Sequence, residues 1–172
     1  GVCDLVVTAP ADSREATNAG VAFVFLDPSQ LSGIVGAEAA DLVFSNRYPG
    51  SFMEAIPLGD ATKDGTDDLA FYLNLTFEEG PAALLIAGDS GTGPIDVEDA
   101  SFAQFYAAGH AISTVSDWDD DGIGEILVAD GGVGRYSLPL SGHVTPWDNA
   151  ASRLMFADPS ESVSGVVGGL EG

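Results

Sequence analysis

The segment GTDDLAFYLN, residues 65–74, has two counterparts in the chain: GVCDLVVTAP at residues 1–10 and GIGEILVADG at residues 122–131. Each version has a glycine, two further residues, an acidic residue and then an apolar run. The acidic residues are Asp4, Asp68 and Glu125. They are 64 and 57 residues apart (68 − 4 and 125 − 68). Self-similarity at a nearly fixed interval is typical of repeat architectures, so the repeat is the first guide to the fold.

The similarity extends to both sides of these segments. After each acid and a turn comes a second apolar run: GVAFVFL, PAALLIAG and GRYSLPL. Before the second and third acids stand SFMEAIPLGD and GHAISTVSDW, and further apolar runs are AADLVFSN, DASFAQFY and AASRLMFA. Short runs rich in Val, Ile, Phe and Leu between turn residues indicate β-strands. No long stretch has helical periodicity, so we expect little helix beyond one short turn within residues 31–40.

Each unit therefore holds about four strands, and radial arrays of four-stranded sheets are β-propellers. We predict an all-β chain, a β-propeller built of four-stranded antiparallel blades, with about three blades present. The expected blades cover approximately residues 1–50, 51–108 and 109–162, and residues 163–172 form a closing strand for the first blade. The whole chain, 1–172, is then a single module. A plain β-sandwich is the alternative, but its strands would not repeat in sequence at this interval.

Two loops carry the clearest chemical signal: DATKDGTDD at residues 60–68 and DWDDDGIGE at residues 117–125. Alternate residues of a tight loop point their oxygens inward, and the glycine after the third oxygen lets the chain turn back. The predicted donors are Asp60, Thr62, Asp64, the carbonyl of Thr66 and Asp68, and Asp117, Asp119, Asp121, the carbonyl of Ile123 and Glu125. Six to eight such oxygens suit Ca²⁺. We therefore expect two calcium sites per chain; a solvated acidic turn is the plainer alternative.

An EF-hand does not fit these loops. An EF-hand needs a glutamate at its twelfth position and a helix on either side. The twelfth residues are Phe71 and Val128, and the flanking segments have the composition of strands. The ninth-position acid closes each loop instead, and the loop joins two strands.

These motifs resemble the FG-GAP repeats of integrin α-subunit β-propellers and similar repeats of bacterial surface proteins. The resemblance rests on GDATKDGTDDLAFY, SDWDDDGIGEILVAD and the partial GVCDLVVTAPADSREATNAGVAFVFL. It implies calcium loops between the first and second strands of a blade, on one rim, with the ten ligands already named. Thr62 stands where the family usually has Asn or Asp, and Glu125 where it usually has Asp.

The two ends of the chain fit together in this scheme. Residues 1–4 match the back half of a third loop, and SVSGVVGG at residues 162–169 matches a strand that leads into such a loop. We expect no metal at this junction, because Gly169 and Glu171 are poor substitutes for the missing acids. Three blades are fewer than a closed propeller has. A homodimer that closes a six-bladed ring, or the remaining blades of a longer propeller, would complete it.

The charge balance excludes some partners. The chain has 5 Lys and Arg against 27 Asp and Glu, a formal charge of −22. Nucleic acids and anionic membrane surfaces need a basic patch, so we expect neither as partner, and no apolar stretch is long enough to insert into a membrane. The balance suits divalent cations or a high-salt habitat. Cys3 is the single cysteine, so no internal disulfide can form, and we expect it to be a small buried residue.

The sequence does not indicate an enzyme. A nucleophilic triad needs a Ser or Cys, a His and an acid, but His110 is expected at a strand start and His143 in a turn. GDSGTG at residues 88–93 looks superficially like a serine-protease signature, but it follows a strand in the position of a repeat turn, and the other repeats lack this motif. Aromatic residues beside acids could stack on a sugar, although packing between blades is the plainer interpretation. The aromatic residues in question are Tyr48, Trp118, Tyr136 and Trp147.

The sequence thus favours a non-enzymatic, calcium-binding propeller module, extracellular or on the cell surface, that serves adhesion or recognition of a protein or glycan. The calcium is expected to be structural. A glycan-binding lectin and an architectural domain of a larger surface protein or enzyme are the alternatives.

Overall fold

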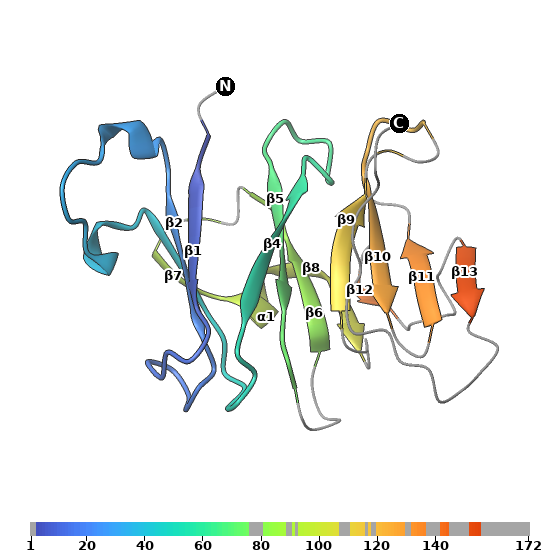
Figure 1. The fold of residues 1–172 in the computed structure, drawn as a ribbon, viewed down its shortest axis with the longest axis horizontal. Helices are drawn as coiled ribbons and strands as arrows, with labels where there is room; N and C mark the ends of the chain where they lie inside the picture. The colour runs from blue at the N-terminus through green and yellow to red at the C-terminus, as the bar shows by residue number, and fades with distance from the viewer. Residues whose placement is uncertain are drawn as a thin grey trace.

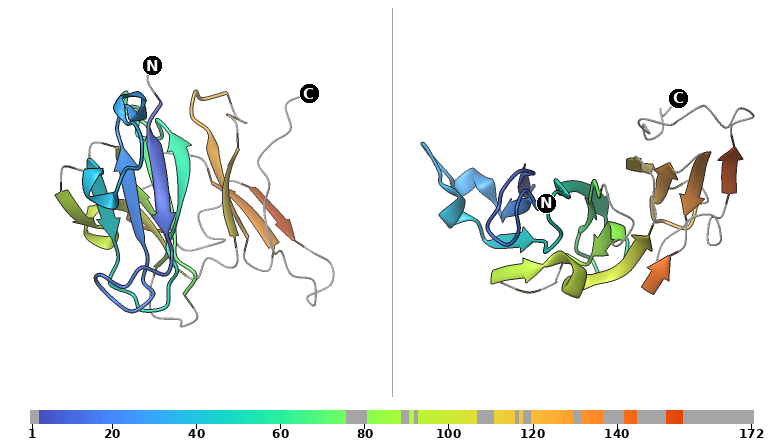
Figure 2. Two further views of the ribbon diagram at one scale, coloured as in Figure 1. Left: turned by 60° about the vertical axis from the view of Figure 1, so that its left-hand side comes forward. Right: turned by 90° about the horizontal axis from the view of Figure 1, so that it is seen from below.

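In a computed structural model, the described residues form a row of three β-sheets (Figure 1). The chain is predominantly β-structure. The structure describes residues 3–75, 81–88, 91, 93–106, 111–115, 117, 120–129, 132–136, 142–144 and 152–155. Viewed from below, the sheets follow a curved, open row (Figure 2).

The first sheet has the strand order β1-β2-β3-β7. Its strands are β1 (Leu5–Ala9), β2 (Val21–Phe25), β3 (Leu42–Ser45) and β7 (Gly93–Asp96). The first three are rich in Val, Phe and Leu, which favour strands, and they pair antiparallel in chain order. The outer strand β7 pairs parallel with β3 although it lies almost 50 residues further along the chain.

The second sheet has five strands in the order β12-β8-β6-β5-β4. They are β4 (Glu54–Gly59), β5 (Asp68–Tyr72), β6 (Pro81–Ile86), β8 (Ser101–Tyr106) and β12 (Gly142–Val144). Strands β4, β5, β6 and β8 are antiparallel neighbours, whereas β12 is parallel to β8.

The third sheet has the order β13-β11-β10-β9 and is antiparallel throughout. Its strands are β9 (Ala111–Val115), β10 (Glu125–Ala129), β11 (Gly132–Tyr136) and β13 (Ser152–Met155). Its first three strands repeat β4, β5 and β6 of the second sheet. Both sheets thus place the predicted loop between their first two strands in chain order.

Helix is confined to single turns in the described residues. The 3₁₀ turns η1 (Pro28–Gln30) and η2 (Ala37–Ala39) lie between β2 and β3. Of the two, η2 falls within residues 31–40, where one short turn was expected, and η1 was not expected. The α-helical turn α1 (Val97–Ala100) follows β7, and Asp96 caps it by accepting hydrogen bonds from the backbone N–H groups of Glu98 and Asp99 at 3.0 and 3.4 Å. None of these helical turns is long and apolar enough to cross a membrane.

The core lies between neighbouring sheets. Between the first and second sheets, the rings of Phe44 and Phe71 meet at 5.1 Å, and both side chains are buried. Between the second and third, Phe105 and Tyr136 meet edge to face at 5.0 Å. Face-to-face packing of successive sheets therefore holds the row together, because a four-stranded sheet must bury its apolar face.

The predicted β-rich architecture of antiparallel sheets is confirmed, and three details differ from expectation. The parallel outer strands β7 and β12 were not predicted, because each pairs with the sheet formed by an earlier repeat. His143 belongs to strand β12 rather than to a turn. Cys3 is exposed rather than buried, because it lies before β1 and outside the sheet. His110 and the segment 163–172 lie outside the described residues.

Candidate metal centre

Two hairpin loops at the same end of neighbouring sheets contain the predicted metal ligands (Figure 1). Residues 60–67 join β4 to β5, and residues 116–124 join β9 to β10. In the second of these loops, 117 and 120–124 belong to the described residues. Asp119 and Trp118 lie outside them, so the structure places four of the five predicted ligands of that loop.

The first loop is organised by its own carboxylates. Asp60 Oδ1 accepts a hydrogen bond from the backbone N–H of Asp64 at 2.9 Å, and its Oδ2 accepts one from Gly65 at 2.9 Å. Asp64 Oδ1 in turn accepts one from the backbone N–H of Thr66 at 2.7 Å. Short polar side chains that bind N–H groups a few residues ahead stabilise tight turns.

The second loop repeats this pattern residue for residue. Asp117 accepts from the backbone N–H groups of Asp121 and Gly122, at 2.9 and 2.7 Å, and Asp121 accepts from Ile123 at 2.8 Å. The donors again lie four, five and two residues after the acceptors. The two loops are therefore equivalent in structure as well as in sequence.

The backbone dihedral angles agree between the loops. Lys63 and Asp120, at the fourth position, have φ values of 61° and 59°. Gly65 and Gly122, at the sixth position, have φ values of 92° and 91°. A side chain at the sixth position would be strained, because residues with a Cβ rarely adopt such angles, so the glycine is needed for the turn.

The closing acids are buried, and each has a partner outside its loop. Asp68 is fully buried; its Oδ1 accepts from the backbone N–H of Gly88 and its Oδ2 from that of Thr62, both at 2.8 Å. Glu125 is 1% exposed and forms an ion pair with Arg135 of β11, with 3.6 Å between Oε1 and Nη1. The longer side chain of Glu125 thus reaches the next strand.

Thr62 is the residue of the first loop whose hydrogen bonding is incomplete. Its Oγ1 is buried and has no hydrogen-bond partner. A buried hydroxyl without a partner is costly, so such groups usually bind something. Thr62 is also the predicted second ligand of the loop. A hard cation bound among the oxygens of the first loop would supply the missing partner.

The acidic side chains of the described loop residues do not point toward one common centre. Among the residues that the structure places, no group of three or more His, Cys, Asp or Glu side chains is close enough to hold a metal ion. Asp60 and Asp64 bind backbone N–H groups instead, yet an ionised carboxylate has about four acceptor sites and can bind an N–H and a cation together. Hydroxyl and carbonyl oxygens, which Ca²⁺ also takes, add to the donor set.

A third, partial copy of the arrangement occurs at β1. Asp4, the counterpart of Asp68, accepts a hydrogen bond through Oδ1 from the backbone N–H of Asp27 at 3.1 Å. Asp27 is the second residue after β2, as Gly88 is the second residue after β6. The acid at the start of β1 and of β5 thus accepts a hydrogen bond from the second residue after the following strand in both of the first two sheets.

The two loops also contact each other. Lys63 Nζ donates a hydrogen bond to the backbone carbonyl of Asp121 at 2.9 Å. Beneath this contact, Ala61 and Ile123, both buried, belong to the core between the second and third sheets. Sequence reasoning did not find this link, or the contacts of Gly88 and Arg135, because the partners are distant in the chain.

The aromatic candidates for sugar stacking have other surroundings. Tyr136 is 1% exposed and packs on Phe105, as the packing interpretation expects. Tyr48 is half-buried against the core between the first and second sheets. Trp118 and Trp147 lie outside the described residues.

Comparisons with protein-family models, with curated proteins and with solved structures find no match to this chain.

Proposed function

We propose that this chain is a calcium-binding module of β-propeller type, in which two structural Ca²⁺ ions hold the loops at residues 60–68 and 117–125. The observation that carries the proposal is the pair of equivalent loops, with aspartates at the first and fifth positions, the same hydrogen bonds and nearly the same backbone angles. The unpartnered, buried hydroxyl of Thr62 supports it independently.

In the first loop the ligands would be Asp60, Thr62, Asp64, Asp68 and the carbonyl of Thr66. In the second they would be Asp117, Asp119, Asp121, Glu125 and the carbonyl of Ile123. The cation neutralises carboxylates that would otherwise repel one another. Two ions change the formal charge from −22 to −18. The role of calcium is to fix a hairpin between two core strands, so removing it should loosen the contact between the second and third sheets.

The wider role is recognition or adhesion at the cell surface or outside the cell, of a protein or a glycan ligand. It is supported by the resemblance to FG-GAP repeats and by the acidic surface, which suits environments rich in divalent cations. A screen of glycans and proteins in calcium and in EDTA would identify the ligand class.

Calcium binding is tested with pairs of variants that carry the same charge change. Asp60→Asn removes a predicted ligand, whereas Asp67→Asn changes an exposed acid of the same loop that is not a ligand. Asp117→Asn and Asp120→Asn form the matching pair in the second loop. Isothermal titration calorimetry should find two ions bound per wild-type chain, and the ligand variants should each lose one.

Thermal unfolding gives the second measurement. Calcium at a hundredfold excess over its Kd stabilises the folded state by about 2.7 kcal/mol per site. The wild-type melting temperature should therefore rise in calcium and fall in EDTA, with Mg²⁺ as the control for non-specific charge screening. Identical melting curves in calcium and EDTA, or equal effects of Asp60→Asn and Asp67→Asn, would refute the proposal.

A further inference from the structure

Lys63 is the single lysine of the chain, and it lies in the first loop between the predicted ligands Thr62 and Asp64. Its φ angle of 61° is uncommon for a residue with a Cβ. Asp120, at the equivalent position of the second loop, has a φ of 59°, and aspartate tolerates this conformation better because its short side chain can hydrogen-bond locally. The backbone of the loop therefore does not favour a lysine here.

The side chain of Lys63 reaches across to the second loop. Its Nζ donates a hydrogen bond to the backbone carbonyl of Asp121 at 2.9 Å, although the two residues are 58 apart in the chain. The carboxylate of Asp121 accepts from the backbone N–H of Ile123, and Asp121 is a predicted ligand of the second loop. One hydrogen bond thus joins a residue flanked by ligands of one site to a ligand residue of the other.

This hydrogen bond joins the parts of the two loops that the core does not hold. Ala61 and Ile123 are 0% and 3% exposed and belong to the core between the second and third sheets. The loop tips, residues 63–67 and 120–122, are exposed. Buried residues are held by packing, whereas exposed backbone is held chiefly by its own hydrogen bonds and by any bound ion. A contact between the tips therefore affects the more mobile part of each loop.

We propose that Lys63 couples the two calcium sites, so that an ion in the first loop raises the calcium affinity of the second loop. The inference rests on the proposed function and adds a form of regulation to the same two sites. Lys63 is a positioning residue in this scheme, because it acts through Asp121 rather than on the ion.

The physical basis is shared ordering of the two tips. When Thr62 and Asp64 both bind an ion, the backbone between them keeps little freedom, so less entropy is lost when Lys63 holds the carbonyl of Asp121. A fixed carbonyl in turn restrains Asp121, so the second loop loses less freedom on binding its own ion. Binding free energies are linked, so an ion in the second loop must favour the first loop by the same factor.

Charge opposes this coupling, and salt separates the two effects. The ammonium of Lys63 and an ion in one loop both make the surroundings of the other loop more positive, so charge alone would weaken the second ion. Repulsion between exposed charges is screened over about 8 Å at physiological ionic strength. Coupling through order should therefore persist or grow as salt is added, whereas coupling through charge alone would be negative and would fade.

The experiment is isothermal titration calorimetry of the full chain with calcium. Asp60→Asn closes the first loop and so reports the second loop alone, and Asp117→Asn does the reverse. The product of the two wild-type association constants, divided by the product of the two single-site constants, is the coupling factor. We expect a factor of about five. Asp67→Asn and Asp120→Asn make the same charge change without removing a predicted ligand, and they correct the single-site constants for charge.

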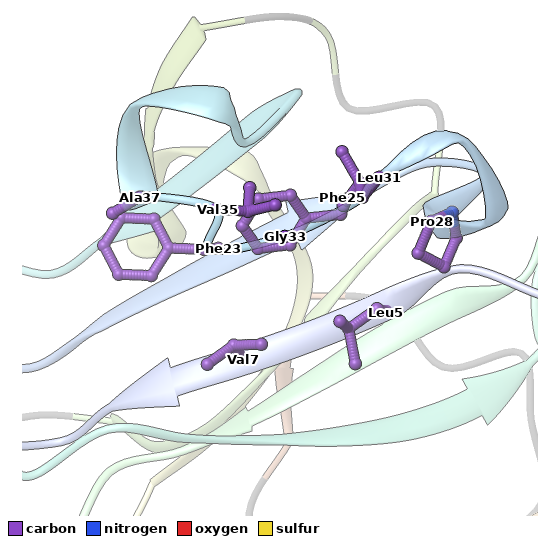
Figure 3. A pocket seen from close by; sticks show the side chains of 9 residues that line it. All are labelled: Leu5, Val7, Phe23, Phe25, Pro28, Leu31, Gly33, Val35 and Ala37. Atoms are coloured by element: carbon purple, nitrogen blue, oxygen red, sulfur yellow. The ribbon is translucent and has the colours of Figure 1, made fainter.

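Variants of Lys63 show whether the factor depends on this side chain. Lys63→Met removes the donor and should reduce the factor to less than about two, whereas Lys63→Arg keeps a charged donor and should preserve it. Arg14→Met is the charge-matched control. Arg14 lies over the ring of Phe23 at 4.8 Å, and Phe23 lines the apolar groove of the first sheet, to which neither loop contributes a residue (Figure 3). Arg14→Met should leave the factor unchanged.

Hydrogen exchange gives a measurement that needs only one ion. In Asp117→Asn, calcium fills the first loop alone, and the amide of Ile123 reports on the second loop because it donates to Asp121 Oδ1. Calcium should slow the exchange of this amide about fivefold. The slowing should disappear when Lys63→Met is added to Asp117→Asn. Circular dichroism checks that each variant folds.

A wild-type coupling factor of one or less would overturn this proposal and leave two independent calcium sites, so the proposed function would stand. Equal coupling factors for the wild type and Lys63→Met would also overturn it, even if Lys63→Met weakened both sites, because Lys63 would then be a structural residue only. A folded chain that binds no calcium would overturn both this proposal and the proposed function.

Discussion

Replacing Thr62 by Val should have opposite effects on the free protein and on the calcium complex. Valine keeps the branched shape of threonine and removes the hydroxyl. Because Thr62 Oγ1 is buried without a partner, the metal-free protein bears the cost of desolvating it. That cost is about 1–3 kcal/mol for a buried polar group. In EDTA, the free energy of unfolding of Thr62→Val should therefore be higher than that of the wild type by this amount.

In calcium the same substitution removes a ligand. At a hundredfold excess over Kd, calcium in the first loop stabilises the wild type by about 2.7 kcal/mol, and a tenfold weaker site would contribute about 1.4 kcal/mol at the same concentration. The advantage of Thr62→Val over the wild type should consequently shrink by about 1.3 kcal/mol when calcium is added. If Thr62 does not bind calcium, the difference in free energy of unfolding between Thr62→Val and the wild type should be the same in EDTA and in calcium.

Urea unfolding followed by circular dichroism, in EDTA and in calcium, measures both quantities, and calorimetry gives the affinity of the first loop. Thr66→Val is the matched control, because the side chain of Thr66 is exposed and only its backbone carbonyl is a predicted ligand. The reasoning would be refuted if Thr62→Val had a lower free energy of unfolding than the wild type in EDTA and if calcium stabilised both proteins equally.

Two further substitutions test the surroundings of the site. Arg135→Met leaves buried Glu125 without its ion-pair partner and should cost on the order of 3 kcal/mol in EDTA. Calcium should restore part of this loss in urea unfolding; equal losses with and without calcium would mean that Glu125 is not a ligand. Phe71→Ala should cost about 3–5 kcal/mol by opening a cavity between the first two sheets, while Phe52→Ala, at 40% exposure, should cost about 0.5 kcal/mol. Similar free energies of unfolding in urea for Phe71→Ala and Phe52→Ala would contradict the packing of Phe71 between the sheets.

Local features of the loops could be predicted from the sequence. Asp60 and Asp117 bind N–H groups four and five residues ahead, so the whole pattern lies within a few residues of chain. Both loops have a glycine at the sixth position, and the positive φ angle of the turn requires it. This requirement is local, so the shared glycine in the sequence is enough to predict the turn. Short apolar runs between turn residues likewise predict the strands, although they do not predict how the strands pair.

Contacts across large separations could not be predicted in this way. Strands β7 and β12 pair with sheets formed by earlier repeats, and nothing in GPID or GHV specifies a parallel neighbour. Lys63 and Asp121 are 58 residues apart, and Asp68 and Gly88 are 20 apart. Such partners are chosen by the packing of whole sheets.

The sequence by itself determined the repeat, the strand-rich character and the form of the two acidic loops, because these depend on side chains within one turn or one strand. The tertiary structure alone decided which sheets neighbour each other and which acids are buried. These outcomes depend on face-to-face burial, a property of the assembled row that no single repeat contains.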